Sequence, residues 1–202
     1  MKKFITLALA LCMALSASIC ASAAEIDTDG GSGSTPVYLS STEDGTMEGD
    51  PSATAMSVTV PTALPMAMSQ TGDVTTADNC QIINNSYGAV RVKSVTISAE
   101  NGWSLTAFGD KSTLASEKVD SDQLGFAICI GDGEWAVTDN SNESAQALIS
   151  ATIDGCYMSG TGNAANNTVS VDYAAIVTPL STPVTNANIA NVVFVVEWDV
   201  AA

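Results

Sequence analysis

The sequence predicts an all-β protein, an antiparallel β-sandwich with a jelly-roll or immunoglobulin-like Greek-key topology. Three observations predict this fold. After residue 55, apolar residues alternate with polar residues in many short runs, which is the period of a half-buried strand. Gly, Asn, Asp and Pro separate the runs, as they do in tight turns. Among these runs, only residues 111–120 suit a helical turn or two. We expect about eight to ten short strands.

The first predicted strands lie between residues 56 and 107. Their alternating residues are, run by run, Met56, Val58 and Val60; Cys80, Ile82 and Asn84; Val90 and Val92; Val95, Ile97 and Ala99; and Trp103, Leu105 and Ala107. The parity changes across Lys93-Ser94, which predicts a β-bulge. Asn101-Gly102 separates the last two runs, so we expect them to form a tight hairpin.

The later predicted strands follow the same alternation. Their residues are Leu124, Phe126, Ile128 and Ile130; Trp135 and Val137; Ala147, Ile149, Ala151 and Ile153; Val169, Val171 and Tyr173; and Val192, Phe194, Val196 and Trp198. Turn signals close several runs, notably Gly131-Asp132-Gly133 and Asp154-Gly155. Trp103 and Trp198 fall in phase with apolar faces, so we expect both to pack in the core.

Residues 1–23 are expected to be a cleavable signal peptide. Two lysines at positions 2 and 3 precede an uncharged apolar run over 4–15, and Ala21-Ser22-Ala23 forms a small-x-small site that would release the chain at Ala24. An apolar helix of this length spans about 18 Å, which is too short for the ~30 Å core of a bilayer. The mature protein is therefore expected to be secreted, at the cell surface or in the extracellular space, and the short Lys-Lys signal is typical of bacteria.

Cys20 leaves a second processing route open, because a lipid could be attached at this residue instead of cleavage before Ala24. Ile19 before it does not suit lipobox cleavage. The most apolar later stretch, residues 190–196, is too short to span a membrane, so we expect no integral membrane span.

Residues 24–54 read as a flexible acidic arm rich in Gly, Ser and Thr, ahead of a β-sandwich domain over 55–202. Val37, Tyr38 and Leu39, preceded by Pro36, form one apolar island in the arm. This island is a candidate for strand addition to another subunit. The alternative is that the arm is only a spacer.

The charge of the chain excludes one class of partner. The sequence has 22 acidic and 6 basic residues, a net charge of −16. Loss of the signal peptide would leave four basic residues and a net charge of −18, because every acidic residue follows residue 23. Phosphate backbones would repel such a chain, so we expect no nucleic-acid binding.

The residues for most catalytic chemistry are missing, and we expect a non-enzymatic protein. The chain contains no histidine, which excludes a Ser-His-Asp triad and imidazole metal sites. Cys80, Cys129 and Cys156 contain no CxxC spacing. Cys129 is expected to be a small, half-buried side chain, and whether any two of the three form a disulfide stays open. A carboxylate pair for glycoside hydrolysis is the remaining catalytic alternative.

Calcium is the best cofactor hypothesis. Asp120 and Asp122, and likewise Asp132 and Glu134, place two carboxylates at i, i+2 in predicted loops, a spacing that suits oxygen ligation. Neither pair matches an EF-hand. Asp-rich turns without any ion have the same pattern, and this alternative is kept.

Sugar binding requires exposed aromatic faces. Trp135, next to the Gly131–Gly133 turn, and Tyr87, in the Asn-Ser-Tyr-Gly turn, are the two candidates for glycan contact.

Several motifs carry a resemblance to a known group of proteins. Residues 58–105 contain a VPxxLP segment, an I-x-N-x-S run and an NGW sequence, and residues 192–199 read VVFVVEWD. In these segments the chain resembles little-characterised exported β-sandwich proteins of Gram-positive bacteria. More distantly it is similar to WxL-type surface proteins and to jelly-roll biofilm-fibre and camelysin-like proteins. The Trp-x-Leu at 103–105 is a single copy, whereas WxL proteins use two for wall binding. The resemblance implies an extracellular structural or adhesive module without catalytic residues.

The sequence thus favours a secreted, non-enzymatic structural or adhesive protein of the cell surface or extracellular matrix that acts through protein contacts, including self-association. The alternative is a module that binds carbohydrate or a cell-wall polymer.

Overall fold

The computed structural model describes residues 55–141 and 144–200. The chain divides into two compact units, Met1–Ser52 and Ala53–Ala202, and the described residues all belong to the second unit. The predicted signal peptide, the arm with Val37, Tyr38 and Leu39, and Cys20 lie outside the described residues.

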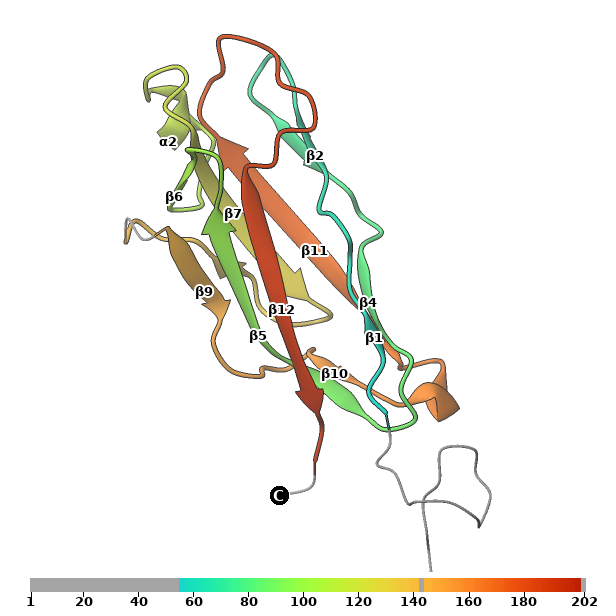
Figure 1. Cartoon of the computed structure of the whole chain (residues 1–202). Coiled ribbons are helices and arrows are strands. Elements are labelled where there is room, and N and C mark those ends of the chain that lie inside the picture. The colour runs from blue at the N-terminus through green and yellow to red at the C-terminus, as the bar shows by residue number, and fades with distance from the viewer. Residues whose placement is uncertain (1–54, 142–143, 201–202) are drawn as a thin grey trace, which may run out of the picture. The chain divides into compact units, whose positions relative to one another are not determined.

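The described domain is all-β, as predicted, and its strands form an antiparallel sandwich of two facing sheets (Figure 1). The strands are β1 (Val58–Thr59), β2 (Met66–Met68), β3 (Val74–Thr76), β4 (Gln81–Asn84), β5 (Val90–Ala99), β6 (Ser104–Thr106), β7 (Gln123–Ile130), β8 (Ala136–Val137), β9 (Ala145–Ile149), β10 (Tyr157–Met158), β11 (Thr168–Val177) and β12 (Ala190–Trp198). A single-turn helix, α2 (Ser112–Ala115), lies within the predicted 111–120, and a 3-10 turn covers Thr161–Asn163.

Two larger sheets and one hairpin make up the domain. The six-stranded sheet has the order β1-β4-β11-β7-β6, with β8 also on β7. The four-stranded sheet has the order β10-β5-β12, with β9 also on β5, and β2 pairs with β3. All pairs are antiparallel except β6 with β7.

The core lies between the two larger sheets. Its fully buried side chains include Ile82, Val90, Val92, Val95, Ile97, Leu124, Ile128, Ile130, Met158 and Val171. These are the alternating residues of the predicted strands, together with Met158 of β10. Trp103 and Trp198 are partly buried and pack against this core, which confirms the expectation for both.

The predicted bulge in β5 is confirmed. In the pairing with β12, Val195 lies opposite Ser94 and Val196 lies opposite Val92, so Lys93 is the extra residue. The bulge keeps apolar side chains on the inner face on both sides of the parity change.

The predicted hairpin across Asn101-Gly102 is wrong. Both residues have positive φ, 51° and 89°, and Trp103 N donates to Glu100 O at 3.0 Å, so the tight turn exists. The strands that it joins belong to different sheets: β5 pairs with β12, and β6 pairs with β7. Leu105 of β6 is buried in the core as part of the six-stranded sheet, whereas β5 belongs to the four-stranded sheet. The turn signal fixed the local backbone and left the pairing partner undetermined.

The predicted run over 147–153 is also only partly correct. The strand β9 ends at Ile149, and its pairing with β5 shifts between Val95 and Thr96, so Leu148 is an extra residue. Gln146 and Ile149 are buried while Ala147 is exposed, because the shift changes which residues face the core. The hairpin of β2 and β3 was not predicted.

Glycine turns hold two loops together at one end of β7. Gly131 and Gly155 have φ of +56° and +87°, and a Cβ at Gly131 would lie 2.5 Å from Gly155 O. A Cβ at Gly155 would lie 2.7 Å from Gly133 N and from Ile130 O. The two turns therefore pack backbone to backbone, with no room for a side chain between them.

Asn84 is the centre of a second turn network. Its side chain is fully buried, although it follows the apolar period of β4. Asn84 Nδ2 donates to Gly88 O and to Ser159 O, both at 2.9 Å, and Oδ1 accepts from Ser86 N at 2.8 Å. The amide thus ties the β4–β5 turn to the loop that follows β10.

Candidate functional site

The outer strand of the four-stranded sheet, β12, is the strongest candidate for a functional surface. Among the described strands it pairs only with β5. Ile189 O accepts from Glu100 N, and Asp199 N donates to Ala89 O, so odd-numbered residues direct their backbone groups toward β5. Backbone groups alternate in direction along a strand, so the even-numbered residues of β12 present N–H and C=O at the open edge.

The inner face of β12 is only half-covered. Its core-facing side chains Val192, Phe194 and Val196 are of intermediate burial, whereas Val90 and Val92 of the neighbouring β5 are fully buried. In Figure 1, β1 and β4 of the other sheet continue past β12 on the side where β12 has no partner strand. The core is therefore incompletely covered along this edge.

The open edge also lacks the usual protection. Edge strands normally carry charges, prolines or bulges that prevent pairing with other chains. Between Ala190 and Val196, β12 contains no charge and no proline, and Val193 and Val195 on its outer face are 54% and 43% exposed. Such a strand is a template for an additional strand.

A charge cluster marks the end of this strand. Glu197 Oε1 contacts Arg91 Nη2 and Glu197 Oε2 contacts Lys93 Nζ, both at 2.8 Å, and Arg91 Nη1 lies 3.6 Å from Asp199. Hydrogen bonds from Lys93 and Arg91 lower the pKa of Glu197. The hydrogen bond with Glu197 raises the pKa of Arg91.

The lowered pKa of Glu197 predicts a specific pH dependence. A carboxyl group whose pKa is lower in the folded state stabilises that state above its unfolded pKa of about 4.3, and this stabilisation is lost as the pH falls through the folded pKa. We expect the urea midpoint of Glu197→Gln to fall less than that of the wild type on acidification below about pH 5. Lys93→Gln, which removes the largest cause of the shift, should change the same pH limb in the same direction. Parallel curves for wild type and Glu197→Gln would contradict this assignment.

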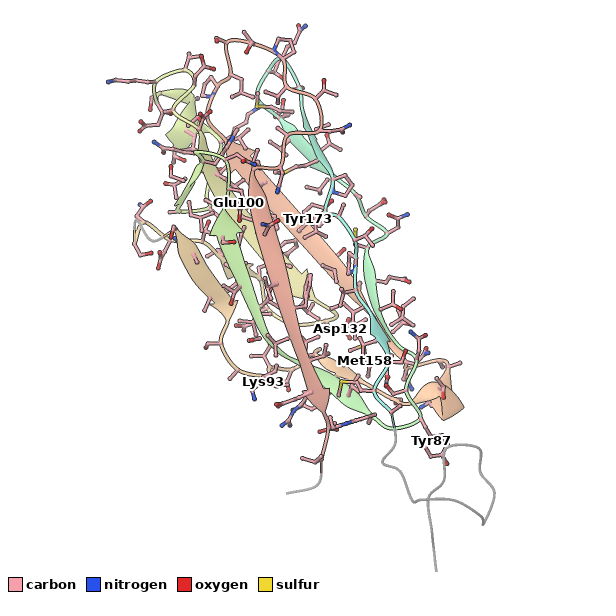
Figure 2. All side chains as sticks on the ribbon, viewed as in Figure 1. Tyr87, Lys93, Glu100, Asp132, Met158 and Tyr173 are labelled. Atoms are coloured by element: carbon pink, nitrogen blue, oxygen red, sulfur yellow. The ribbon has the colours of Figure 1, made fainter. Side chains whose placement is uncertain are left out.

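The two glycan-contact candidates are exposed, as expected, but on different turns. Tyr87 is 83% exposed and lies in the β4–β5 turn, whose carbonyls pack against Gly160 and Thr161. Trp135 is 53% exposed and precedes β8, next to the interlocked glycine turns. Figure 2 shows Tyr87 at the end of the domain, apart from Asp132 of the glycine turn.

The calcium candidates lie at opposite ends of β7. Asp120 and Asp122 precede the strand with φ of 59° and 50°, and Asp120 accepts from Ser181 N at 2.8 Å and from its hydroxyl. These Ser181 hydrogen bonds lower the pKa of Asp120. Eight residues of strand, about 26 Å, separate this pair from Asp132 and Glu134. The hydrogen bonds from Ser181 therefore give Asp120 a structural role in the turn.

Asp132 and Glu134 line a pocket of about 270 Å³, together with Gly133, Ile153 and Asp154. The sequence did not indicate Asp154 as a neighbour of this pair. Within residues 55–141 and 144–200, no group of three or more His, Cys, Asp or Glu side chains is arranged to hold a metal ion.

The three cysteines among the described residues, Cys80, Cys129 and Cys156, are free thiols. Cys129 and Cys156 are buried, and burial raises the pKa of both thiols. Cys129 is thus more buried than expected, because the turn at 131–133 folds over it and its thiol donates to Gly133 O at 3.1 Å. Cys80 is half-buried. Protonated, buried thiols are poor nucleophiles.

No helix in the described part of the chain is long and apolar enough to cross a membrane. Comparison with known proteins found no match to the chain among family models, curated proteins or solved structures.

Proposed function

We propose that this protein is a secreted, non-enzymatic structural or adhesive component of the cell surface or extracellular matrix, which works through protein contacts. The observation that carries the proposal is the open edge of β12, with unpaired backbone groups, apolar side chains and a half-covered inner face. An extended segment added there would pair with the even-numbered residues and cover Val192, Phe194 and Val196.

The proposed donor is the island from Pro36 to Ser40 of another copy. In an added strand, Val37 and Leu39 would share one face, and that face would complete the core, while Tyr38 would point away from it. Repetition of this contact from copy to copy produces an open, head-to-tail assembly, which suits a structural role.

Removal of residues 24–54 tests the donor. The truncated chain is expected to keep its fold, because Ala53–Ala202 is a compact unit of its own, and to lose high-order assembly. Circular dichroism reports the fold and light scattering reports the size. An unchanged assembly size after truncation would refute the donor segment.

Two proline variants test the accepting edge. Val192→Pro removes an N–H that faces the open edge, so we expect a folded chain with impaired assembly. Val193→Pro is the matched control, because it removes an N–H that faces β5 and is therefore expected to destabilise the domain itself. Normal assembly of Val192→Pro would exclude β12 as the acceptor.

The exposure of Tyr87 and Trp135 supports a second candidate function, binding of carbohydrate or a cell-wall polymer. This function predicts that Trp135→Ala or Tyr87→Ala abolishes glycan binding without a loss of thermal stability. A glycan array on which the wild-type protein binds nothing would remove this candidate.

A further inference from the structure

We propose that the outer face of the four-stranded sheet is a second self-association surface, on which another copy of this chain stacks face to face with its strands in the opposite direction. This surface is separate from the open edge of β12, because it uses side chains of the sheet face and no edge backbone groups. Between Lys93 and Glu100, the outer-face residues on three adjacent strands are Ser94, Thr96, Ser98, Asn191, Val193, Val195, Ala145 and Ala147. Arg91 and Glu197 lie on the same face beyond Lys93 and pair with each other.

The middle of the face is built from small side chains in cross-strand rows. Thr96 of β5 lies opposite Val193 of β12 on one side and opposite Ala147 of β9 on the other. Ser94 lies opposite Val195. Rows of short side chains permit close approach of a second sheet, as in the facing sheets of a sandwich.

The absence of charge in the middle of this face, between Lys93 and Glu100, is informative in a chain of net charge −16. Two copies repel each other wherever acidic surfaces meet. None of the eight outer-face residues between Lys93 and Glu100 is charged, and Val193 and Val195 remain 54% and 43% exposed. Contact at this face therefore buries apolar surface without bringing carboxylates together.

Charged side chains at the two ends of the face determine the direction of stacking. Lys93, with 55% of its side chain exposed, lies at the bulge near the start of β5, and Glu100 follows the end of that strand (Figure 2). Lys93 Nζ contacts Glu197 Oε2, and because an ammonium group has three N–H donors, two of them remain for another partner. Glu100 Oε1 accepts from Asn191, which leaves Oε2 for a further donor.

Antiparallel stacking places Glu100 of each copy beside Lys93 of the other. Lys93 and Glu100 are separated by about 23 Å of strand, so the two-fold axis passes close to Thr96. Parallel stacking would instead bring Lys93 to Lys93 and Glu100 to Glu100. Charge complementarity therefore selects the antiparallel arrangement.

The size of the face indicates a reversible contact. The face is three strands wide and about seven residues long, so it covers roughly 300 Å² per copy. This area is well below the ~800 Å² per partner of a stable complex. A contact of this size becomes strong only when it is repeated, as it would be between neighbouring copies of an assembly.

Cysteine cross-linking of the chain from Ala24 onward tests the geometry. Thr96→Cys, in a Cys80→Ala background, lies opposite its own symmetry mate across the roughly 10 Å between facing sheets, so a bismaleimide of about that length should cross-link it into a dimer. Thr75→Cys on β3 is the matched control, since it is an exposed strand position outside the four-stranded sheet. Equal dimer yields for the two variants would overturn the proposal.

Charge reversal tests the direction of stacking. Lys93→Glu and Glu100→Lys should each weaken self-association about tenfold in sedimentation experiments. The double variant restores opposite charges at both contacts and should recover association to near the wild-type level. A double variant no better than either single variant would refute the antiparallel arrangement. Because these variants leave the arm and the β12 backbone intact, the result is independent of the truncation experiment.

Discussion

Replacement of Gly155 with alanine is expected to destabilise the domain by roughly 2–5 kcal/mol, through left-handed backbone strain and overpacking together. The φ of Gly155 is +87°, which an alanine adopts only with strain. The new Cβ would also lie 2.7 Å from Gly133 N and Ile130 O, and these are backbone atoms that cannot rotate away. Urea unfolding followed by tryptophan fluorescence measures the loss.

Gly102→Ala is the matched control for this prediction. Gly102 has nearly the same φ, +89°, but a Cβ there would meet no atom within 4 Å. The control therefore isolates the backbone strain, and we expect it to cost only about 1–2 kcal/mol. Equal losses at the two positions would show that the contact between the glycine turns contributes nothing.

Asn84→Ala is expected to cost about 2–4 kcal/mol, because it leaves buried backbone groups without partners. The side-chain amide of Asn84 donates to Gly88 O and to Ser159 O and accepts from Ser86 N, and this side chain is fully buried. Truncation to alanine also leaves a small cavity in the turn network.

The neighbouring residue supplies the control. Asn85 is exposed and its side chain donates only to the hydroxyl of Thr59, at 2.9 Å, so Asn85→Ala should change stability by less than about 0.5 kcal/mol. A comparable loss in both variants would mean that the β4–β5 turn tolerates the missing amide. Chemical denaturation at neutral pH distinguishes the two outcomes.

The alternation of side chains was the most predictable part of this fold. It identified the core residues of β5, β7, β11 and β12, and the parity change at Lys93 located the bulge. Both follow from a local rule, because burial on one face of a strand requires a period of two. Partners of strands follow no such local rule. The turn at Asn101-Gly102 was recognised correctly, but its following strand pairs with a distant segment.

In the candidate sites, too, local features could be predicted from the sequence and features that depend on strand pairing could not. The exposure of Tyr87 and Trp135 was predictable, since Tyr87 lies in a turn and Trp135 lies next to one. The open edge of β12 was not, because its sequence has the same alternation as that of any core strand. Whether a strand is central or peripheral depends on the sheet order, and the sheet order depends on contacts far apart in the chain. Asp154, in the pocket beside Asp132, was missed for the same reason.

The position of β5 has a further consequence for the order of folding. Every other strand of its sheet pairs with β5, and β12 is about 100 residues later in the chain. One edge of β5 therefore remains without its partner until residues 190–198 have left the ribosome. Non-local pairing of this kind is typical of domains that fold in milliseconds to seconds. A nascent chain ending before residue 190 is expected to stay unfolded, because β5 then lacks the longest strand that pairs with it.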